Sequence, residues 1–279
     1  MTKAFLYILG ASSDPDNCEC SVPFLIDEEE IFFGPCKRRL RKMLKDEYLK
    51  RDSVTSPKDD IYLIGFNASN SQKCREIVWV GKISRLMTFE YAYCNLTALK
   101  YQAMRRLSDS PFHLKPLYDA RGALIGYKHT SSMHARGNDW IMDLISRESE
   151  RTEREGEELR LRKFDRFEAF PRDCCLILEN IFYARGAGIK ISGQILRVLK
   201  KAQEEKDDID RYAIFGRQKN GSPNGLTGSW LEMSGEQADK FIKVIQSDAP
   251  RNVSEVWKEQ QNYLKKCRCT SSKHKDVRC

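Results

Sequence analysis

Short runs of β-branched and aromatic residues recur irregularly along the chain, and this spacing constrains the fold more than any other feature. The strand-like runs cover residues 5–9, 22–26, 31–33, 61–66, 77–83, 175–178 and 212–216. Runs of this length and composition, bounded by polar turn residues, are typical of buried strands. No regular strand–helix–strand repeat connects them, so the pattern favours an α+β fold over a doubly wound parallel sheet. We predict a small mixed or antiparallel β-sheet, or a barrel, with packed helices.

Helical spacing marks three stretches between these strands. Residues 37–48 have a basic exposed side, and their apolar side chains share one face at Leu40, Met43, Leu44 and Tyr48. Thr88 is a suitable N-cap for a second helix. Ser234 and Gln237 form a capping box that predicts a third helix.

Domain organisation is predicted to be simple. A chain of 279 residues can form one large domain, which we place at residues 1–266. Residues 146–166 are dense in charges of both signs at helical spacing, and predict an exposed helical insertion. Residues 267–279 form a basic tail that contains cysteines and no apolar run able to join the core.

The lengths of the apolar runs and the cysteine content bear on the expected cellular location. No apolar run approaches the roughly 18 residues needed to cross a bilayer, so we expect a cytoplasmic protein without a membrane partner. Ten cysteines in such a compartment are expected to be free thiols. Clustered soft ligands could complete a zinc site, but no Cys-x-x-Cys pair is present and we predict no metal; these ligands are Cys18, Cys20, Cys267, Cys269, His274 and Cys279.

The predicted helix that follows Gly34-Pro35 concentrates positive charge. Residues 37–51 hold eight basic and two acidic side chains, a net charge of +6 out of +8 for the whole chain. Clustered cations beside a helix N-terminus suit a phosphate, so we expect an anion to contact Lys37, Arg38 and Arg41. The alternative is a solvated basic face without a ligand.

Aromatic residues near these cations or in the other predicted strands suggest that the anion is part of a nucleotide or nucleic acid. Bases stack on aromatic rings while Lys and Arg hold phosphate. The candidate ligand contacts are Trp79, Phe89, Tyr91, Phe182, Tyr183 and the neighbouring Arg185. Core packing is the alternative for each ring.

Catalytic signals are weaker. His134, with Asp139 nearby in sequence, is the best-placed histidine for proton transfer, and an ordinary surface histidine is the alternative. The chain has no Walker phosphate loop, no two-histidine zinc motif and no nucleophile elbow, and Gly186-Ala-Gly188 supplies only part of a dinucleotide fingerprint. The sequence identifies no cofactor.

Three segments carry a resemblance to a known family. They are Pro23-Phe24, the run from Ile31 to Arg41 that contains Gly-Pro-Cys-Lys-Arg-Arg-Leu-Arg, and Asp60-Ile-Tyr-Leu-Ile-Gly65. Together they resemble the second family of nucleotide modification associated domains. The positions that match the family pattern are Phe24, Cys36, Lys37, Arg41 and Gly65, with Phe182 and Tyr183 as later candidates.

The resemblance implies an α+β domain, comparable to small β-barrel readers of modified bases, with a role in nucleic-acid (DNA) modification or in bacterial and phage conflict, including phage defence. The chain departs from the family pattern at Leu40, in the acidic segment Asp27–Glu30, and in lacking a clear histidine-containing middle segment.

Three functional hypotheses remain open from the sequence. The first is a binding module for a nucleotide, a modified base or nucleic acid, with a cationic and aromatic pocket. The second is an enzyme acting on a nucleotide or DNA base, in which Lys37 and a helix N-terminus would lower the pKa of the Cys36 thiol. The third is a protein-interaction module that uses the charged helix and the tail.

Overall fold

The structure is a computed structural model of the chain. It describes residues 1–8, 23–34, 38–66, 76–101, 114–129, 153–155, 158–160, 170–184, 188–190, 197 and 230–248.

Nine of the described strands form one large sheet. Their bounds are β1 Thr2–Ile8, β2 Phe24–Leu25, β3 Glu30–Phe33, β4 Val54–Thr55, β5 Asp60–Phe66, β6 Glu76–Met87, β11 Cys175–Tyr183, β12 Ile189–Lys190 and β13 Leu231–Ser234. The strand order is β13-β1-β5-β6-β11-β3-β2, and β4 and β12 also pair with β6. β1 and β5 are parallel, whereas the other described pairs of this sheet are antiparallel. The fold is therefore mixed α+β with a mostly antiparallel sheet, which confirms the predicted class.

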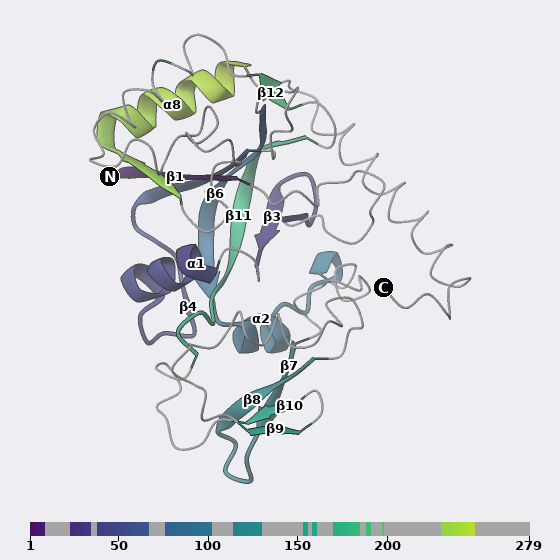
Figure 1. Cartoon of the computed structure of the whole chain (residues 1–279). Coiled ribbons are helices and arrows are strands. Elements are labelled where there is room, and N and C mark those ends of the chain that lie inside the picture. The colour runs from purple at the N-terminus through teal and green to yellow at the C-terminus, as the bar shows by residue number, and fades with distance from the viewer. Residues whose placement is uncertain are drawn as a thin grey trace, which may run out of the picture.

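Helices cover both faces of this sheet, because successive residues of its strands point to opposite sides. Phe5 of β1 belongs to a buried cluster with Leu40 of helix α1 (Arg38–Leu44), which continues directly into the π-helix η1 (Lys45–Leu49). Leu6, the next residue of β1, packs in a separate cluster with Phe241. Phe241 lies on α8, which spans Gly235–Asp248 and crosses the sheet beside β1 (Figure 1).

A smaller sheet lies beyond the ends of β6 and β11, at the bottom of the view (Figure 1). Its strands are β7 Leu114–Tyr118, β8 Leu124–His129, β9 Glu153–Glu155 and β10 Glu158–Arg160, in the antiparallel order β7-β8-β10-β9. Helix α2 (Phe89–Asn95) follows β6 and packs near β7. A third buried cluster, which includes Met87, Phe89 and Tyr127, joins α2 to both sheets.

The charged segment at 146–166 differs from the helix expected there. Its described residues form the two short strands β9 and β10. Their register places Glu153 opposite Arg160, and Glu158 opposite Lys128 of β8. The helix predicted for this segment is therefore wrong for these six residues, because the backbone of β10 pairs with β8 on one side and with β9 on the other.

The start of α2 agrees with the sequence analysis, and α8 begins directly after Ser234, which ends β13. Thr88 is the N-cap of α2, and its hydroxyl accepts a hydrogen bond of 3.1 Å from the backbone N–H of Tyr91. The tail 267–279 lies outside the described residues. None of the helices in the described part of the chain is both long and apolar enough to span a membrane.

Candidate functional site

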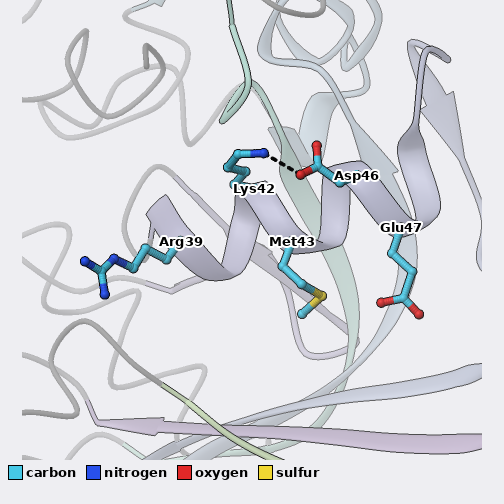
Figure 2. Close-up of a pocket in the computed structure, with 5 residues that line it drawn as sticks. All are labelled: Arg39, Lys42, Met43, Asp46 and Glu47. Atoms are coloured by element: carbon cyan, nitrogen blue, oxygen red, sulfur yellow. Dashed lines mark hydrogen bonds and ion pairs between the residues drawn. The ribbon is translucent and has the colours of Figure 1, made fainter. Parts of the chain in front are cut away.

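An open pocket lies along the outward face of α1 and η1 (Figure 2). Its volume is about 460 Å³, and it is lined by Arg39, Lys42, Met43, Asp46 and Glu47. These positions follow the spacing i, i+3, i+4, i+7 and i+8, which places them on one stripe of a helix. We call this stripe the α1 pocket.

Charges in the α1 pocket are ordered along the helix. The cations Arg39 and Lys42 come first, Met43 lies between, and the carboxylates Asp46 and Glu47 follow. The Lys42 Nζ donates to Asp46 Oδ2 at 2.5 Å, and both side chains are about half exposed. Among the described residues Arg39 makes no ion pair, so it is the pocket cation that is most accessible to an anion.

Glu47 is bound to the sheet below. Lys3 of β1 donates from Nζ to Glu47 Oε1 at 2.5 Å and to the Tyr48 hydroxyl at 2.8 Å. Burial alone would raise the pKa of Glu47, but hydrogen bonds with Lys3 and Tyr48 lower it below its usual value. The pKa of Lys3 is raised by its hydrogen bond with Glu47 and, to a smaller extent, by that with Tyr48. The pair is therefore ionised at neutral pH and fixes one end of the pocket.

The second half of the α1 pocket lies on an unusual backbone. π-helices are rare in proteins and occur frequently at functional sites. In η1 the inward-facing side chains of Lys45 and Leu49 are buried. The backbone N–H of Lys50 donates to the Lys45 carbonyl at 2.6 Å, and Lys50 has φ 53° and ψ −116°, a strained conformation for a non-glycine residue.

Two of the cations in the basic run point into the protein. Arg41 is fully buried, and its Nη1 donates to the carbonyls of Arg172 and, at 3.2 Å, Cys174. Lys45 is 3% exposed and donates to the Phe170 carbonyl at 2.5 Å. The structure thus differs from the expectation that Arg41 lies on the exposed side. These cations attach α1 and η1 to the segment 170–174, so the positive surface is smaller than the sequence suggests.

The segment 170–174 also organises α2 and the smaller sheet through a buried carboxylate. Asp173 is 2% exposed. Its Oδ1 accepts from the backbone N–H of Phe89 at 2.7 Å, and its Oδ2 accepts from the Tyr127 hydroxyl at 2.7 Å. The Arg41 guanidinium lies 5.7 Å from the centre of the Phe89 ring. Arg41 and Phe89, both predicted ligand contacts, are therefore brought together inside the protein.

The aromatic residues predicted to stack on bases are divided among the three buried clusters. Trp79 and Tyr183 belong to the cluster beneath α1, Phe89 and Tyr91 to the cluster around α2, and Phe182 to the cluster beneath α8. Trp79, Phe89 and Phe182 are buried, whereas Tyr91 and Tyr183 are partly buried. The Tyr183 hydroxyl donates to the Pro23 carbonyl at 2.9 Å. The described rings thus form no single stacking surface.

Trp79 has the most constrained surroundings of these rings. It lies 5.8 Å from Tyr7 and 5.9 Å from Phe33 between ring centres. A side chain at Gly65, its partner across the sheet, would place Cβ 2.0 Å from Trp79 Nε1. The absence of a side chain at Gly65 therefore provides the space for the indole. Within the described part of the chain, Trp79 Nε1 is buried without a hydrogen-bond acceptor.

The remaining predicted site residues cannot be compared with the α1 pocket. Cys36, Lys37, His134 and Arg185 lie outside the described residues. Phe24 begins β2, where its backbone pairs with Phe32, and Arg38 begins α1; the side chains of Phe24 and Arg38 are also outside the described part.

The described cysteines have no metal-binding arrangement. Cys174 and Cys175 are fully buried, and burial raises the pKa of the Cys174 thiol to about 12 and that of Cys175 well above its usual value. Both are therefore protonated and unreactive at neutral pH. Across the described residues no group of His, Cys, Asp and Glu side chains could hold a metal ion.

Sequence reasoning missed most of the α1 pocket. Met43 packs against the buried cluster beneath α1, as its place on the apolar face predicts, but it is only partly buried and also lines the pocket. In the sequence analysis Asp46 and Glu47 entered only into the net charge of residues 37–51. The spacing of residues 39, 42, 43, 46 and 47 is the signal that could have identified this stripe.

No protein-family model, curated protein or solved structure matches this chain.

Proposed function

We propose that the protein binds a nucleotide, free or within a nucleic acid, in the α1 pocket. The order of charges along the pocket carries this proposal. Helix dipoles favour acidic residues near the N-terminus and basic residues near the C-terminus. In the pocket the cations Arg39 and Lys42 come first and the carboxylates Asp46 and Glu47 last. The helix dipole does not favour this order, and a ligand with a negatively charged end and a hydrogen-bond-donating end would match it.

The chemistry of the pocket suits the parts of a nucleotide. Arg39 makes no ion pair within the described part of the chain, so its guanidinium can bind a phosphate. The Lys42–Asp46 pair is exposed, and such (i, i+4) pairs contribute only about 0.3–0.5 kcal/mol, so a phosphate can take Lys42 from Asp46 at small cost. The Met43 thioether and the aliphatic stems of its neighbours supply an apolar surface for a flat ring.

Two further observations support this location. The pocket spans the junction of α1 with η1, and η1 ends at the strained Lys50. Rare backbone conformations of both kinds concentrate at functional sites. The sequence resemblance to nucleotide modification associated domains supports a nucleotide as the ligand class. We extend the proposal to a role as a reader of bases in nucleic-acid modification or in bacterial and phage conflict.

The proposal is tested by isothermal titration of nucleoside monophosphates into the purified full-length protein. Wild-type protein is compared with Arg39→Gln/Lys42→Gln and with a control of equal charge, Lys115→Gln/Lys240→Gln. Lys240 forms an exposed (i, i+4) pair with Glu236 on α8, so its loss matches that of Lys42. Lys115 is an exposed residue of β7.

We expect the pocket variant to lose about five- to tenfold in affinity and the control to bind as the wild type does. If both variants lose affinity equally, the loss results from the change in net charge, and the α1 pocket is not the binding site.

A further inference from the structure

We infer that Trp230 is the stacking surface for the base of a nucleotide whose phosphate is bound by Arg39. This inference rests on the proposed function and adds a second part of the molecule, the edge of the large sheet at β13, to the same site. It also narrows the ligand class, because a sugar phosphate without a base gains nothing from an indole ring and binds more weakly than a nucleotide.

The two long edges of the α1 and η1 helices face different parts of the large sheet. On one edge, Arg41 donates to carbonyls of segment 170–174, which leads into β11. On the other edge, Met43 and Glu47 lie together (Figure 2). Glu47 is bound there by Lys3 of β1. Since β13 lies beyond β1 in the strand order, this second edge faces the β13 side of the sheet.

The direction of α1 places Arg39 near the carboxyl end of β1. The two elements run antiparallel (Figure 1), and the bond between Lys3 and Glu47 fixes one point where they meet. Arg39 precedes Glu47 by eight residues, about 12 Å along the helix axis. Tyr7 follows Lys3 by four residues, about 13 Å along the strand. Arg39 and Tyr7 therefore lie at the same end of this edge.

Trp230 lies beside Tyr7 on the outer strand. In the antiparallel pairing of β1 with β13, Leu6 is opposite Leu231. The same register places Trp230, the residue before Leu231, next to Tyr7. Trp230 is partly buried and packs against the buried cluster beneath α1, against which Met43 also packs. Its indole is therefore on the same face of the sheet as the α1 pocket.

The surroundings of Trp230 suit a stacking surface. Tyr7 is 2% exposed and makes edge-to-face contacts with Phe33 and Trp79, with 5.8 Å between ring centres in each. Trp230 thus borders a packed aromatic layer, yet it retains exposed surface of its own. A ring that is already held in place loses little conformational entropy when a ligand stacks on it. An indole for the base beside a guanidinium for the phosphate matches the two ends of a nucleotide.

The experiment is isothermal titration of AMP and ribose 5-phosphate into the full-length protein. The two probes carry the same sugar and phosphate and differ by the base. Trp230→Leu removes the flat ring and keeps an apolar side chain, and Tyr118→Leu, which removes an exposed aromatic residue of β7, is the control. We expect Trp230→Leu to weaken AMP about fivefold and to leave ribose 5-phosphate unchanged. Tyr118→Leu is expected to bind both probes as the wild type does.

Tryptophan fluorescence gives a second readout with a more conservative variant. The chain has four tryptophans. We expect AMP to quench the fluorescence of the wild type and ribose 5-phosphate to leave it unchanged. Trp230→Phe keeps an aromatic ring at this position, so it is expected to fold and to bind AMP nearly as tightly as the wild type. The quenching by AMP is expected to disappear in this variant.

The possible results separate the inference from the proposed function. An AMP affinity that is unchanged in Trp230→Leu, or quenching that persists in Trp230→Phe, would overturn the inference and leave nucleotide binding in the α1 pocket intact. Equal weakening of AMP and ribose 5-phosphate in Trp230→Leu would also overturn it, since the effect would then not depend on the base. Absence of AMP binding by the wild type would overturn both.

Discussion

At the scale of single residues, the two arginines Arg39 and Arg41 show that helix phase decides the use of a charge. Arg41 shares its side of the helix with Lys45, so both reach the carbonyls of segment 170–174. Arg39 lies on the exposed stripe and lines the α1 pocket. In the sequence both arginines belong to one basic run. The net charge of a segment does not show which of its side chains point into the protein.

We predict that Arg41→Ala destabilises the fold whereas Arg39→Ala does not. Removal of the buried guanidinium leaves the carbonyls of Arg172 and Cys174 without that donor and opens a cavity beside Phe89. The expected loss in the free energy of unfolding is about 3 kcal/mol. Urea denaturation measures it, with Arg39→Ala as the control. Equal stability of the two variants would show that the buried contacts of Arg41 do not hold the fold.

We also predict that Gly65→Ala is destabilising because of Trp79. The added methyl group would overlap the indole, and overpacking of this kind costs about 1–3 kcal/mol. In the background Trp79→Phe the smaller ring leaves room, so the same Gly65→Ala change is expected to cost less. A double-mutant cycle on free energies of unfolding gives the coupling. If the free-energy costs of the two substitutions are additive, the strain from Gly65→Ala does not come from contact with Trp79.

At the scale of secondary-structure elements, Asp173 connects parts of the chain that are distant in sequence. Through its two carboxylate oxygens it holds the first turn of α2 and the Tyr127 hydroxyl of β8. Asp173 therefore adds a buried polar connection to the apolar cluster that joins α2 and the smaller sheet to the large sheet.

Replacement of Asp173 by alanine is expected to loosen these elements locally. The variant leaves a backbone N–H and a buried hydroxyl without this acceptor, a loss of about 2–4 kcal/mol. Hydrogen exchange followed by mass spectrometry should show faster exchange in α2 and β8, with β1 and β5 protected as in the wild type. If hydrogen exchange instead becomes faster across both sheets, the loss of Asp173 destabilises the whole fold and not these elements alone.

The hairpin of β7 and β8 was not predicted from the sequence. The region 113–145 could not be assigned from its pattern, yet Asp119 organises a turn there by accepting from the backbone N–H of Arg121 and of Ala123. Gly122 adopts φ 79°, which suits glycine. This Asp-x-x-Gly signal was present in the sequence. The strands β9 and β10 were not predicted, because charges of both signs at (i, i+4) spacing favour a helix and the pairing of β10 with β8 is not a local signal.

At the scale of the whole molecule, the buried thiols make stability depend on alkaline pH. Burial raises the pKa of Cys174 to about 12, against about 8.5 in an unfolded chain. Above pH 8.5 the unfolded state therefore loses a proton that the folded state keeps, and the free energy of unfolding falls up to about pH 12. Cys174→Ala is expected to make this decline shallower in denaturant titrations at pH 7 to 10. An unchanged slope would mean that the thiol is not buried in solution.

The fold class could be predicted from the sequence because strand patterns and helix caps are local signals, as in β1, β5 and the Thr88 cap. The α1 pocket lies within the basic run 37–51, although Arg41, one of the cations predicted to contact an anion, does not line it, and Lys37 and the side chain of Arg38 lie outside the described residues. Which cations of this run face the solvent was not predicted, because the burial of Arg41 and Lys45 depends on packing against segment 170–174. The separation of Trp79, Phe89 and Phe182 into different clusters likewise follows from strand order and chain path.

Methyl NMR at methionine is the most direct test of the claim that the α1 pocket binds a nucleotide. The chain has seven methionines, and Met43 lines the pocket, whereas Met87 and Met233 are buried in other clusters. In protein with ¹³C-methyl methionine, assigned by Met→Leu variants, CMP is expected to shift the Met43 resonance in a saturable manner and to leave Met87 and Met233 unchanged. A Met43 resonance that does not move at saturating CMP would contradict the account.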